Sequence, residues 1–375
     1  MLTLFSFIIV FGILVFAHEL GHFLAARKLG VRVEEFGFGF PPRIWSKEKR
    51  ETLYSVNLIP LGGFVKLYGE QGEDEKNLES YSAKTKLQKA LILVSGVTMN
   101  FLLTAFILTI IYSIGFQTFI LGMENHKGVI NTQEVVIEKV EEKTPAAEVL
   151  RQGDIVKKVD NEPIFLDSDI FVKINEKTKQ SPEQPVTITI VRDGKEESKI
   201  LKTYEIEAEV KGQKMKVRRI GVGLETRGGI RVPVYFAPFV AISETARLAG
   251  LTLLGILSFF GQIATRLTIS ENVVGPAKIV TMVGGAAEAG IMPLMQFMAI
   301  LSISLAVINI MPIPALDGGH LLIILVEKIR RKDLSHDAKN MVQFVGFGAL
   351  LLLMVLITFR DLAGVSVLEY IKRVF

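Results

Sequence analysis

The stretch FAHELGHFLAA, Phe16–Ala26, carries the residues of this chain that are best suited to metal chemistry. Residues four apart on a helix share a face, so His18 and His22 can bind one metal ion together. Glu19 projects beside them, where its carboxylate can take the proton of a water molecule that the metal activates. This spacing is that of a zinc-hydrolase helix, and it predicts a zinc site with Glu19 as the general base or acid.

A catalytic zinc ion needs a third protein ligand, and the chain has no cysteine to supply one. The best candidate is Asp317, in the segment NIMPIPALDGGH. Pro312 and Pro314 break a helix there, and the two glycines after Asp317 let backbone approach closely. Two other interpretations stay open: Asp317 caps the helix that follows it, and the histidines form a hydrogen-bonded helix–helix cluster without metal.

The composition is more apolar than that of an ordinary soluble protein. Hydrophobic residues make up 49% of the 375 residues. The length allows roughly two or three domains. The net charge of +4 is small, and no basic patch is interleaved with aromatic residues, so we expect no nucleic acid as a partner.

Four segments are long and apolar enough to cross a bilayer as helices, and they lie within residues 1–30, 89–117, 293–327 and 338–361. The first lacks a basic leader and a small-residue cleavage pattern, so we interpret it as a retained helix and not as a signal peptide. A charge at the centre of a span costs roughly 2.5–3.5 kcal/mol and usually marks function. Two histidines and a glutamate inside the first span therefore favour a metal site over a chance match.

Lysine and arginine in short loops predict the orientation. They gather after the first span and again between the third and fourth, and both segments are expected to be cytoplasmic: Arg27, Lys28, Arg32, Arg43, Lys47, Lys49, Arg50; Lys328, Arg330, Arg331, Lys332, Lys339. An even number of crossings must separate these segments. A further apolar stretch, Leu248–Ala264 within residues 227–292, would break that count, so we assign it to the membrane surface as an amphipathic helix.

The remaining regions are less apolar. Residues 31–88 are rich in β-branched and aromatic residues and contain the turn Pro60-Leu61-Gly62-Gly63, which predicts a β-hairpin. Residues 125–226 are polar, with alternating strands and a short helix that begins at Pro145. We expect an α+β domain there, on the other side of the membrane from the basic loops. Residues 362–375 are a C-terminal tail.

Two motifs in separate spans carry a family resemblance. His-Glu-x-x-His in the first span and Asn-x-x-Pro-x-Pro-x-x-Asp-Gly in a later one resemble those of the site-2 proteases, which are intramembrane zinc metalloproteases. TPAAEVLRQGDIVKKVDNEPI resembles the PDZ domain that the RseP-like bacterial branch inserts between its central spans, although only one such stretch is evident. The implied fold is a multi-pass α-helical membrane protein with four transmembrane helices, a membrane-associated β-hairpin region and an inserted PDZ-like α+β domain.

The resemblance also implies roles for individual residues. His18, His22 and Asp317 would bind one Zn²⁺ per chain, and Glu19 would be the catalytic residue. The implied substrate-binding residues are Asn309, Asn100, Gly62, Gly63 and Phe64. Asn100 and Gly96 match the family's Gly-x-x-x-Asn element, but Val97 stands where proline is common. The hairpin resembles a membrane-dipping one whose edge pairs with unwound substrate, and a plain cytoplasmic hairpin is the alternative.

The implied function is cleavage of transmembrane segments of single-pass membrane proteins, such as an anti-sigma factor, or of remnant signal peptides. Such substrates would first be trimmed by another protease, and the lipid bilayer is the other expected partner. The expected location is the bacterial cytoplasmic (inner) membrane, with the PDZ-like domain extracytoplasmic and the active site toward the cytoplasm. The alternative function is a non-proteolytic, PDZ-bearing membrane scaffold with a polar helix cluster in place of a metal site.

Overall fold

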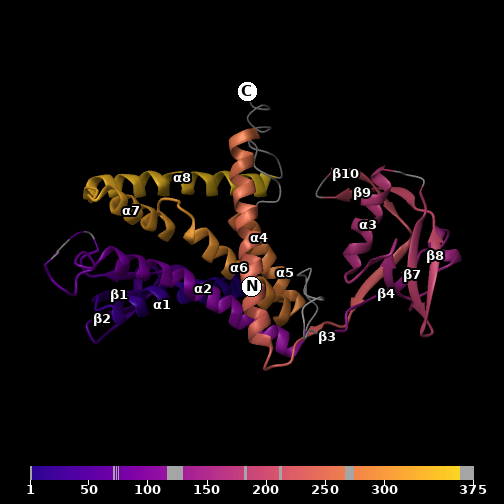
Figure 1. Ribbon diagram of the computed structural model, residues 1–375, viewed down its shortest axis with the longest axis horizontal. Helices are drawn as coiled ribbons and strands as arrows, with labels where there is room; N and C mark the ends of the chain where they lie inside the picture. Colours follow the sequence, from indigo (N-terminus) through magenta and orange to yellow (C-terminus); the bar gives the residue numbers. More distant parts are fainter. Residues whose placement is uncertain are drawn as a thin grey trace. The chain divides into compact units, whose positions relative to one another are not determined.

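The computed structural model describes residues 2–70, 72, 74, 76–115, 130–180, 184–210, 213–266 and 274–363 (Figure 1). Two compact units are present. The helical unit lies within residues 1–111 and 238–375, and the β-sheet unit lies within residues 112–237. The sheet unit is therefore an insertion between helices of the first unit.

Long apolar helices dominate the helical unit. They are α1 (Leu2–Lys28), α2 (Lys86–Ile114), α4 (Ala237–Arg266), α5 (Pro276–Ala289), α6 (Ile291–Ile310), α7 (Asp317–Arg330) and α8 (His336–Ala363). Within the described residues, five are long and apolar enough to cross a membrane, namely α1, α2, α4 over Ala237–Gln262, α6 and α8. The expected count of four is therefore not confirmed. The additional helix contains the stretch Leu248–Ala264, and its mean hydropathy of 1.5 is below the 2.1–2.4 of the other four.

The predicted third span is two helices and not one continuous helix. α6 ends at Ile310 and α7 begins at Asp317, because Pro312 and Pro314 lie in the connecting segment and cannot continue a helix. This break places a carboxylate at the start of a new helix.

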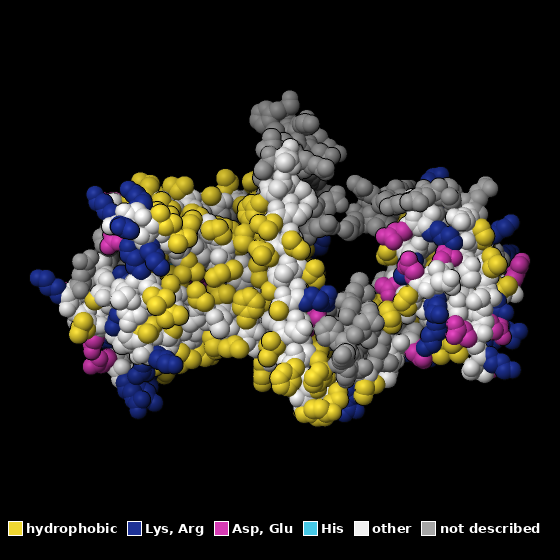
Figure 2. Space-filling view, in the orientation of Figure 1, with side chains coloured by type: hydrophobic (Ala, Val, Ile, Leu, Met, Phe, Trp, Pro, Cys, Tyr) yellow, Lys and Arg dark blue, Asp and Glu magenta, His cyan; other side chains and the backbone are white. Residues whose placement is uncertain are grey.

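Helix α1 packs against α5, α6 and the β1–β2 region. Its N-terminal half packs into a buried cluster in which Val10 and Leu14 meet Val283 of α5, with Leu103 of α2 beside them. Its C-terminal half packs through Phe23 against the β1–β2 sheet. Figure 2 shows hydrophobic side chains gathered over the helices, and lysine and arginine at the end where α7, α8 and the sheet lie.

The β1–β2 region is more elaborate than the predicted hairpin. β1 (Val33–Lys49) and β2 (Thr52–Leu67) each pair twice, since Phe36 is opposite both Val65 and Tyr54, and Tyr54 is also opposite Lys47. Four stretches therefore lie side by side in the order 43–49, 52–57, 33–40 and 63–67. The stretch 63–67 is an edge of this sheet, and it packs against α1.

The β-sheet unit is built on one six-stranded sheet. Its strands are ordered β11-β4-β5-β7-β8, with β6 paired to β5: β4 (Glu134–Val140), β5 (Ile155–Val159), β6 (Glu162–Pro163), β7 (Val186–Arg192), β8 (Lys195–Leu201), β11 (Val222–Arg227). Two small ribbons accompany it: β3 (Ile130–Asn131) with β12 (Ile230–Arg231), and β9 (Tyr204–Val210) with β10 (Gln213–Arg219). Pro145–Glu148 forms the short helix predicted to begin at Pro145.

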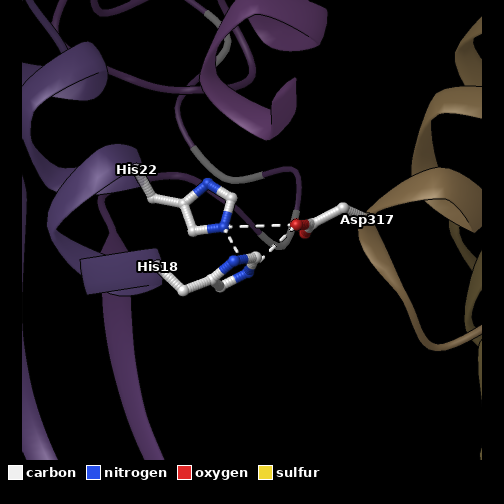
Figure 3. Close-up of side chains that lie close together, drawn as sticks. All are labelled: His18, His22 and Asp317. Atoms are coloured by element: carbon white, nitrogen blue, oxygen red, sulfur yellow. Dashed lines mark hydrogen bonds and ion pairs between the residues drawn. The ribbon is translucent and has the colours of Figure 1, made fainter. Parts of the chain in front are cut away.

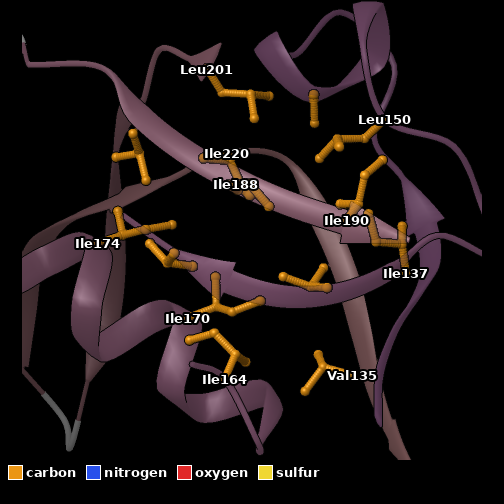
Figure 4. Close-up of a cluster of buried hydrophobic side chains, with 14 residues drawn as sticks. Val135, Ile137, Leu150, Ile164, Ile170, Ile174, Ile188, Ile190, Leu201 and Ile220 are labelled. Carbon is orange, nitrogen blue, oxygen red and sulfur yellow. The ribbon is translucent and has the colours of Figure 1, made fainter. Parts of the chain in front are cut away.

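One helix of this unit was not predicted. α3 (Asp167–Gln180) is mostly polar, and only a few apolar residues at helical spacing mark its inner face. Two of these, Ile170 and Ile174, are buried against Ile188 and Ile190 of β7 in the core of the unit (Figure 4).

A buried ion pair stabilises this unit. Asp154 accepts hydrogen bonds from Arg192 Nε at 2.7 Å and Nη2 at 2.6 Å, and from the Arg151 N–H at 2.8 Å. Burial raises the pKa of Asp154, but these hydrogen bonds outweigh it and the pKa lies below its ordinary value. The contribution to stability is thus complete above the unfolded pKa of about 3.9 and is lost as pH falls through the lowered folded pKa.

We expect Asp154→Ala to destabilise the sheet unit by about 3 kcal/mol at neutral pH, because it leaves Arg192 partly buried without its partner. Hydrogen exchange of the full chain should show β5 and β7 amides exchanging about 100-fold faster. Glu196→Ala removes a long, exposed contact of 3.9 Å to Lys158 and is the matched control. Unchanged β7 protection in the Asp154 variant would contradict the prediction.

Candidate metal centre

Three side chains from two distant helices meet inside the helical unit (Figure 3). His18 and His22 come from the C-terminal half of α1, and Asp317 is the first residue of α7. Asp317 Oδ2 lies 3.2 Å from His18 Nε2 and 3.4 Å from His22 Nε2, and the two Nε2 atoms are 3.2 Å apart. The sequence-predicted ligand set is therefore brought together at one point.

The spacing of these three atoms suits a zinc ion. Atoms at the usual 2.0–2.1 Å from a tetrahedral zinc lie about 3.3 Å from one another, close to the separations here. Asp317 Oδ2 is buried and receives no hydrogen bond from the described residues, so the atom that faces the histidines is left for a cation. Two imidazoles and one carboxylate are the donor set of a catalytic zinc site with an open fourth position.

The segment between α6 and α7 places Asp317. A Cβ on Gly318 would lie 2.1 Å from the Met311 carbonyl oxygen, so only glycine permits this tight path. From α8, Gln343 Oε1 accepts the Ala315 N–H, and Gly346 packs against Pro314. Asp317 does not cap α7, because the N-cap position is Leu316 and no side chain makes a capping hydrogen bond there.

Helix α2 lies directly behind the histidines. A Cβ on Gly96 would lie 2.4 Å from His22 Nε2 and 3.0 Å from His18 Cε1, so a larger residue would displace both rings. His22 Nδ1 donates to the Ile92 carbonyl oxygen at 2.8 Å. That bond leaves Nε2 of the neutral ring unprotonated, as a metal ligand requires.

The two predicted asparagines lie on either side of His18. Asn309, in the last turn of α6, has its amide 3.3 Å from His18 Nε2 and is partly exposed. Asn100, on α2, has its amide 3.3 Å from His18 Nδ1 and no exposed surface. The substrate contact of Asn100 stays a prediction, and in this conformation the side chain has no exposed surface.

The predicted glycine–phenylalanine segment lies at the sheet edge. A Cβ on Gly63 would be 3.3 Å from Glu19 Cγ, so this edge passes beside the glutamate of α1. Gly62 has φ +127° and lies against the Phe40 ring, and the Phe64 ring covers Gly37. Gly62 and Phe64 shape the edge, and Gly63 is the residue of the three that adjoins the metal centre.

A cavity of about 1000 Å³ adjoins the centre. His22 and Asp317 line it together with Glu70, Tyr81 and His320. The cavity extends to charged residues at the start of α2 and around the connection between α7 and α8. There Asp333 pairs with Lys86 at 2.8 Å and Lys339 pairs with buried Glu327 at 2.7 Å. The cavity is thus a polar route between the metal centre and the basic end of the helices.

Several residues of this site were not predicted. Gln343, Glu70 and Tyr81 belong to no metal-binding pattern, and their part in the site depends on how distant segments pack. The only available signal was the polar character of Gln343 within an apolar helix, which is costly unless the side chain has a partner.

A set of long apolar helices that carries a His-His-Asp centre inside it is the architecture of a membrane-embedded metallohydrolase. The chain belongs to peptidase family M50, whose family profile matches residues 6–353, and it is therefore a protease. The family and the apolar helices together give a membrane location.

Individual relatives match along almost the whole chain. Zinc metalloprotease RasP of Geobacillus kaustophilus is 28% identical, over 96% of this chain and 97% of the relative. Regulator of sigma-W protease RasP of Bacillus subtilis (strain 168) is 26% identical, over 96% of this chain and 98% of the relative. Among solved structures, the PDZ domain of an SdrC-like protein from Listeria monocytogenes is 26% identical with a TM-score of 0.20, covering 24% of this chain and 85% of that domain.

Proposed function

We propose that this protein is a zinc endopeptidase that cuts transmembrane segments of single-pass membrane proteins inside the bilayer. The observation that carries the proposal is the placement of His18, His22 and Asp317 within 3.2–3.4 Å of one another on apolar helices. Ionisable residues at this depth are costly and usually mark a reaction site. The substrate bond must then lie within the membrane too.

The roles of the residues follow from their positions. His18, His22 and Asp317 would hold the zinc ion, which when bound supplies a Lewis acid for the peptide carbonyl and for water. Glu19 takes the proton of the attacking water and delivers it to the leaving amine. Asn309, partly exposed beside His18 Nε2, donates from its amide to the substrate carbonyl.

Substrate binding is assigned to the edge formed by residues 63–67. A helical substrate hides its carbonyls in hydrogen bonds, so it must unwind before attack. An extended segment pairs with a free sheet edge through main-chain hydrogen bonds, and this edge passes beside Glu19 at Gly63. Gly62 and Phe64 are assigned to keep the edge in place.

The proposed topology has four spans, α1, α2, α6 and α8, with both basic segments cytoplasmic. α4 is assigned to the membrane surface. Its lower mean hydropathy and the charged pair Glu244–Arg247 support this assignment. The active site then opens to the cytoplasm through the polar cavity, and the sheet unit is extracytoplasmic, in the bacterial inner membrane.

The sheet unit is assigned the role of a PDZ-like filter that admits substrates already shortened by another protease. An anti-sigma factor is a fitting substrate class, because the Bacillus subtilis relative is named for regulation of sigma-W. Remnant signal peptides share the same chemistry, a single apolar helix with one short polar end.

The test uses the purified full chain in detergent with two model substrates that differ in their apolar segment. One segment contains glycine and proline, and the other is a leucine-rich helix. We expect mass spectrometry to place the cut inside the apolar segment, with the first substrate cut faster. A chelator should stop cleavage and added zinc should restore it. Cutting outside the apolar segment, or cutting unaffected by the chelator, would overturn the proposal.

A further inference from the structure

Asn100 occupies a position that the proposed chemistry does not use. It lies on α2 with no exposed surface, and its amide points at His18 Nδ1, on the far side of that ring from Asp317. Its backbone carbonyl oxygen accepts hydrogen bonds from Thr104 Oγ1 and Ser302 Oγ, both at 2.9 Å. The backbone of Asn100 is therefore tied to α6, and its side chain is covered by protein.

The His18 ring has one nitrogen on each side of this arrangement. Nε2 faces His22 and Asp317, and Nδ1 faces Asn100. A neutral imidazole carries a single N–H, so Nε2 is a metal ligand only when the proton is on Nδ1. That proton needs an acceptor, because a buried N–H without a partner is costly.

The Asn100 side chain is able to supply that acceptor. An amide oxygen and nitrogen have nearly the same shape, so the hydrogen-bond network decides which of them faces a neighbour. With Nδ2 toward His18, Oδ1 is buried and receives no hydrogen bond from the described residues. Turning the amide over brings Oδ1 to within reach of Nδ1–H and puts Nδ2 in the place where Oδ1 receives no hydrogen bond from the described residues.

We propose that Asn100 is a positioning residue whose Oδ1 accepts the Nδ1–H of His18 and so keeps Nε2 of that ring unprotonated toward His22 and Asp317. Ile92 does the same for His22 through its backbone carbonyl. Helix α2 thus orients both histidines, and Gly96 between these two positions leaves room for the rings. The inference rests on the proposed zinc site and adds a residue that sets the tautomer of one of its ligands.

The test compares Asn100→Asp with Asn100→Leu in the full chain, by competition for zinc against a chromogenic chelator. Asp keeps an acceptor and no donor, so we expect zinc affinity within a few-fold of the parent protein. Leu keeps the volume and has no acceptor, so we expect affinity to fall about 10–100-fold. Ser302→Ala, which removes a bond to the Asn100 backbone only, is the matched control and should bind zinc like the parent.

Equal losses in the Asp and Leu variants would overturn the inference, as would full affinity in the Leu variant or a Ser302→Ala loss as large as that of Leu. A second measurement depends neither on bound zinc nor on catalysis. In metal-free protein labelled with ¹⁵N at histidine, His18 should carry its proton on Nδ1 in the parent and lose that preference in the Leu variant. A parent protein that binds no zinc would instead defeat the proposed function, so the two failures are distinguishable.

Discussion

Glu19→Gln should lower the rate of substrate cleavage by about 10²–10⁴-fold while leaving zinc bound. Glutamine has the size of glutamate, so the contact of this side chain with Gly63 at the sheet edge is kept. It cannot accept the proton of the attacking water or deliver one to the leaving amine. The loss should therefore appear in kcat, with little change in KM, when cleavage of a model transmembrane substrate is followed.

The control for this experiment is Glu70→Gln. Glu70 lines the same cavity and is a carboxylate near His22, and it accepts a 3.5 Å hydrogen bond from the Leu67 N–H, which the Oε1 of glutamine can still accept. We expect it to retain activity within about an order of magnitude, since it affects the site only through its charge. Wild-type cleavage by the Glu19 variant, with zinc bound, would remove Glu19 from the mechanism.

The members of the His18–His22–Asp317 group, and Glu19 beside them, were predictable because ionisable side chains are conspicuous in apolar segments. His18, Glu19, His22 and Asp317 are expensive in apolar segments, so their presence alone demanded an explanation. The proline pair before Asp317 predicted a break, and the structure has one between Ile310 and Asp317. Such features are local, and a single sequence displays them directly.

The features that the sequence did not predict depend on tertiary packing: the direction in which a side chain points and the partners of each strand. Asn100 was expected at the substrate because of its place in a motif, and the motif does not say that its amide points at His18 Nδ1 and has no exposed surface. The four-stretch sheet was expected as a hairpin because residues 31–88 are rich in β-branched and aromatic residues and contain the turn Pro60-Leu61-Gly62-Gly63. Only the pairing of Phe36 with both Tyr54 and Val65 distinguishes the two.

The helical unit also explains why a water-dependent site is compatible with apolar helices. The apolar surfaces face outward, as on α8, where Phe344, Phe347 and Leu352 are exposed. The polar residues face inward and continue from the metal centre into the cavity. The cavity therefore offers water a route to the site from the basic end, and the proposed substrate approach is from the sheet edge.

Replacing Asp317 should separate metal binding from folding. Asp317→Ala removes one of three ligands, so zinc affinity should fall by more than the roughly 100-fold expected for an outer partner, and cleavage should be lost with it. Because α7 has no side-chain cap, the helix does not depend on this carboxylate and should remain folded. Asp333→Asn, which changes an exposed carboxylate paired to Lys86 at the far part of the cavity, is the control and should keep zinc.

Asp317→Cys extends this test, because the chain has no cysteine of its own. A thiolate is a strong zinc ligand, so this variant should bind zinc or cadmium where the alanine variant does not. Bound metal should also protect the single thiol from an alkylating reagent, and a chelator should expose it. Equal alkylation with and without metal would show that the side chain at position 317 does not face the ion, and the His18–His22–Asp317 centre would then be wrong.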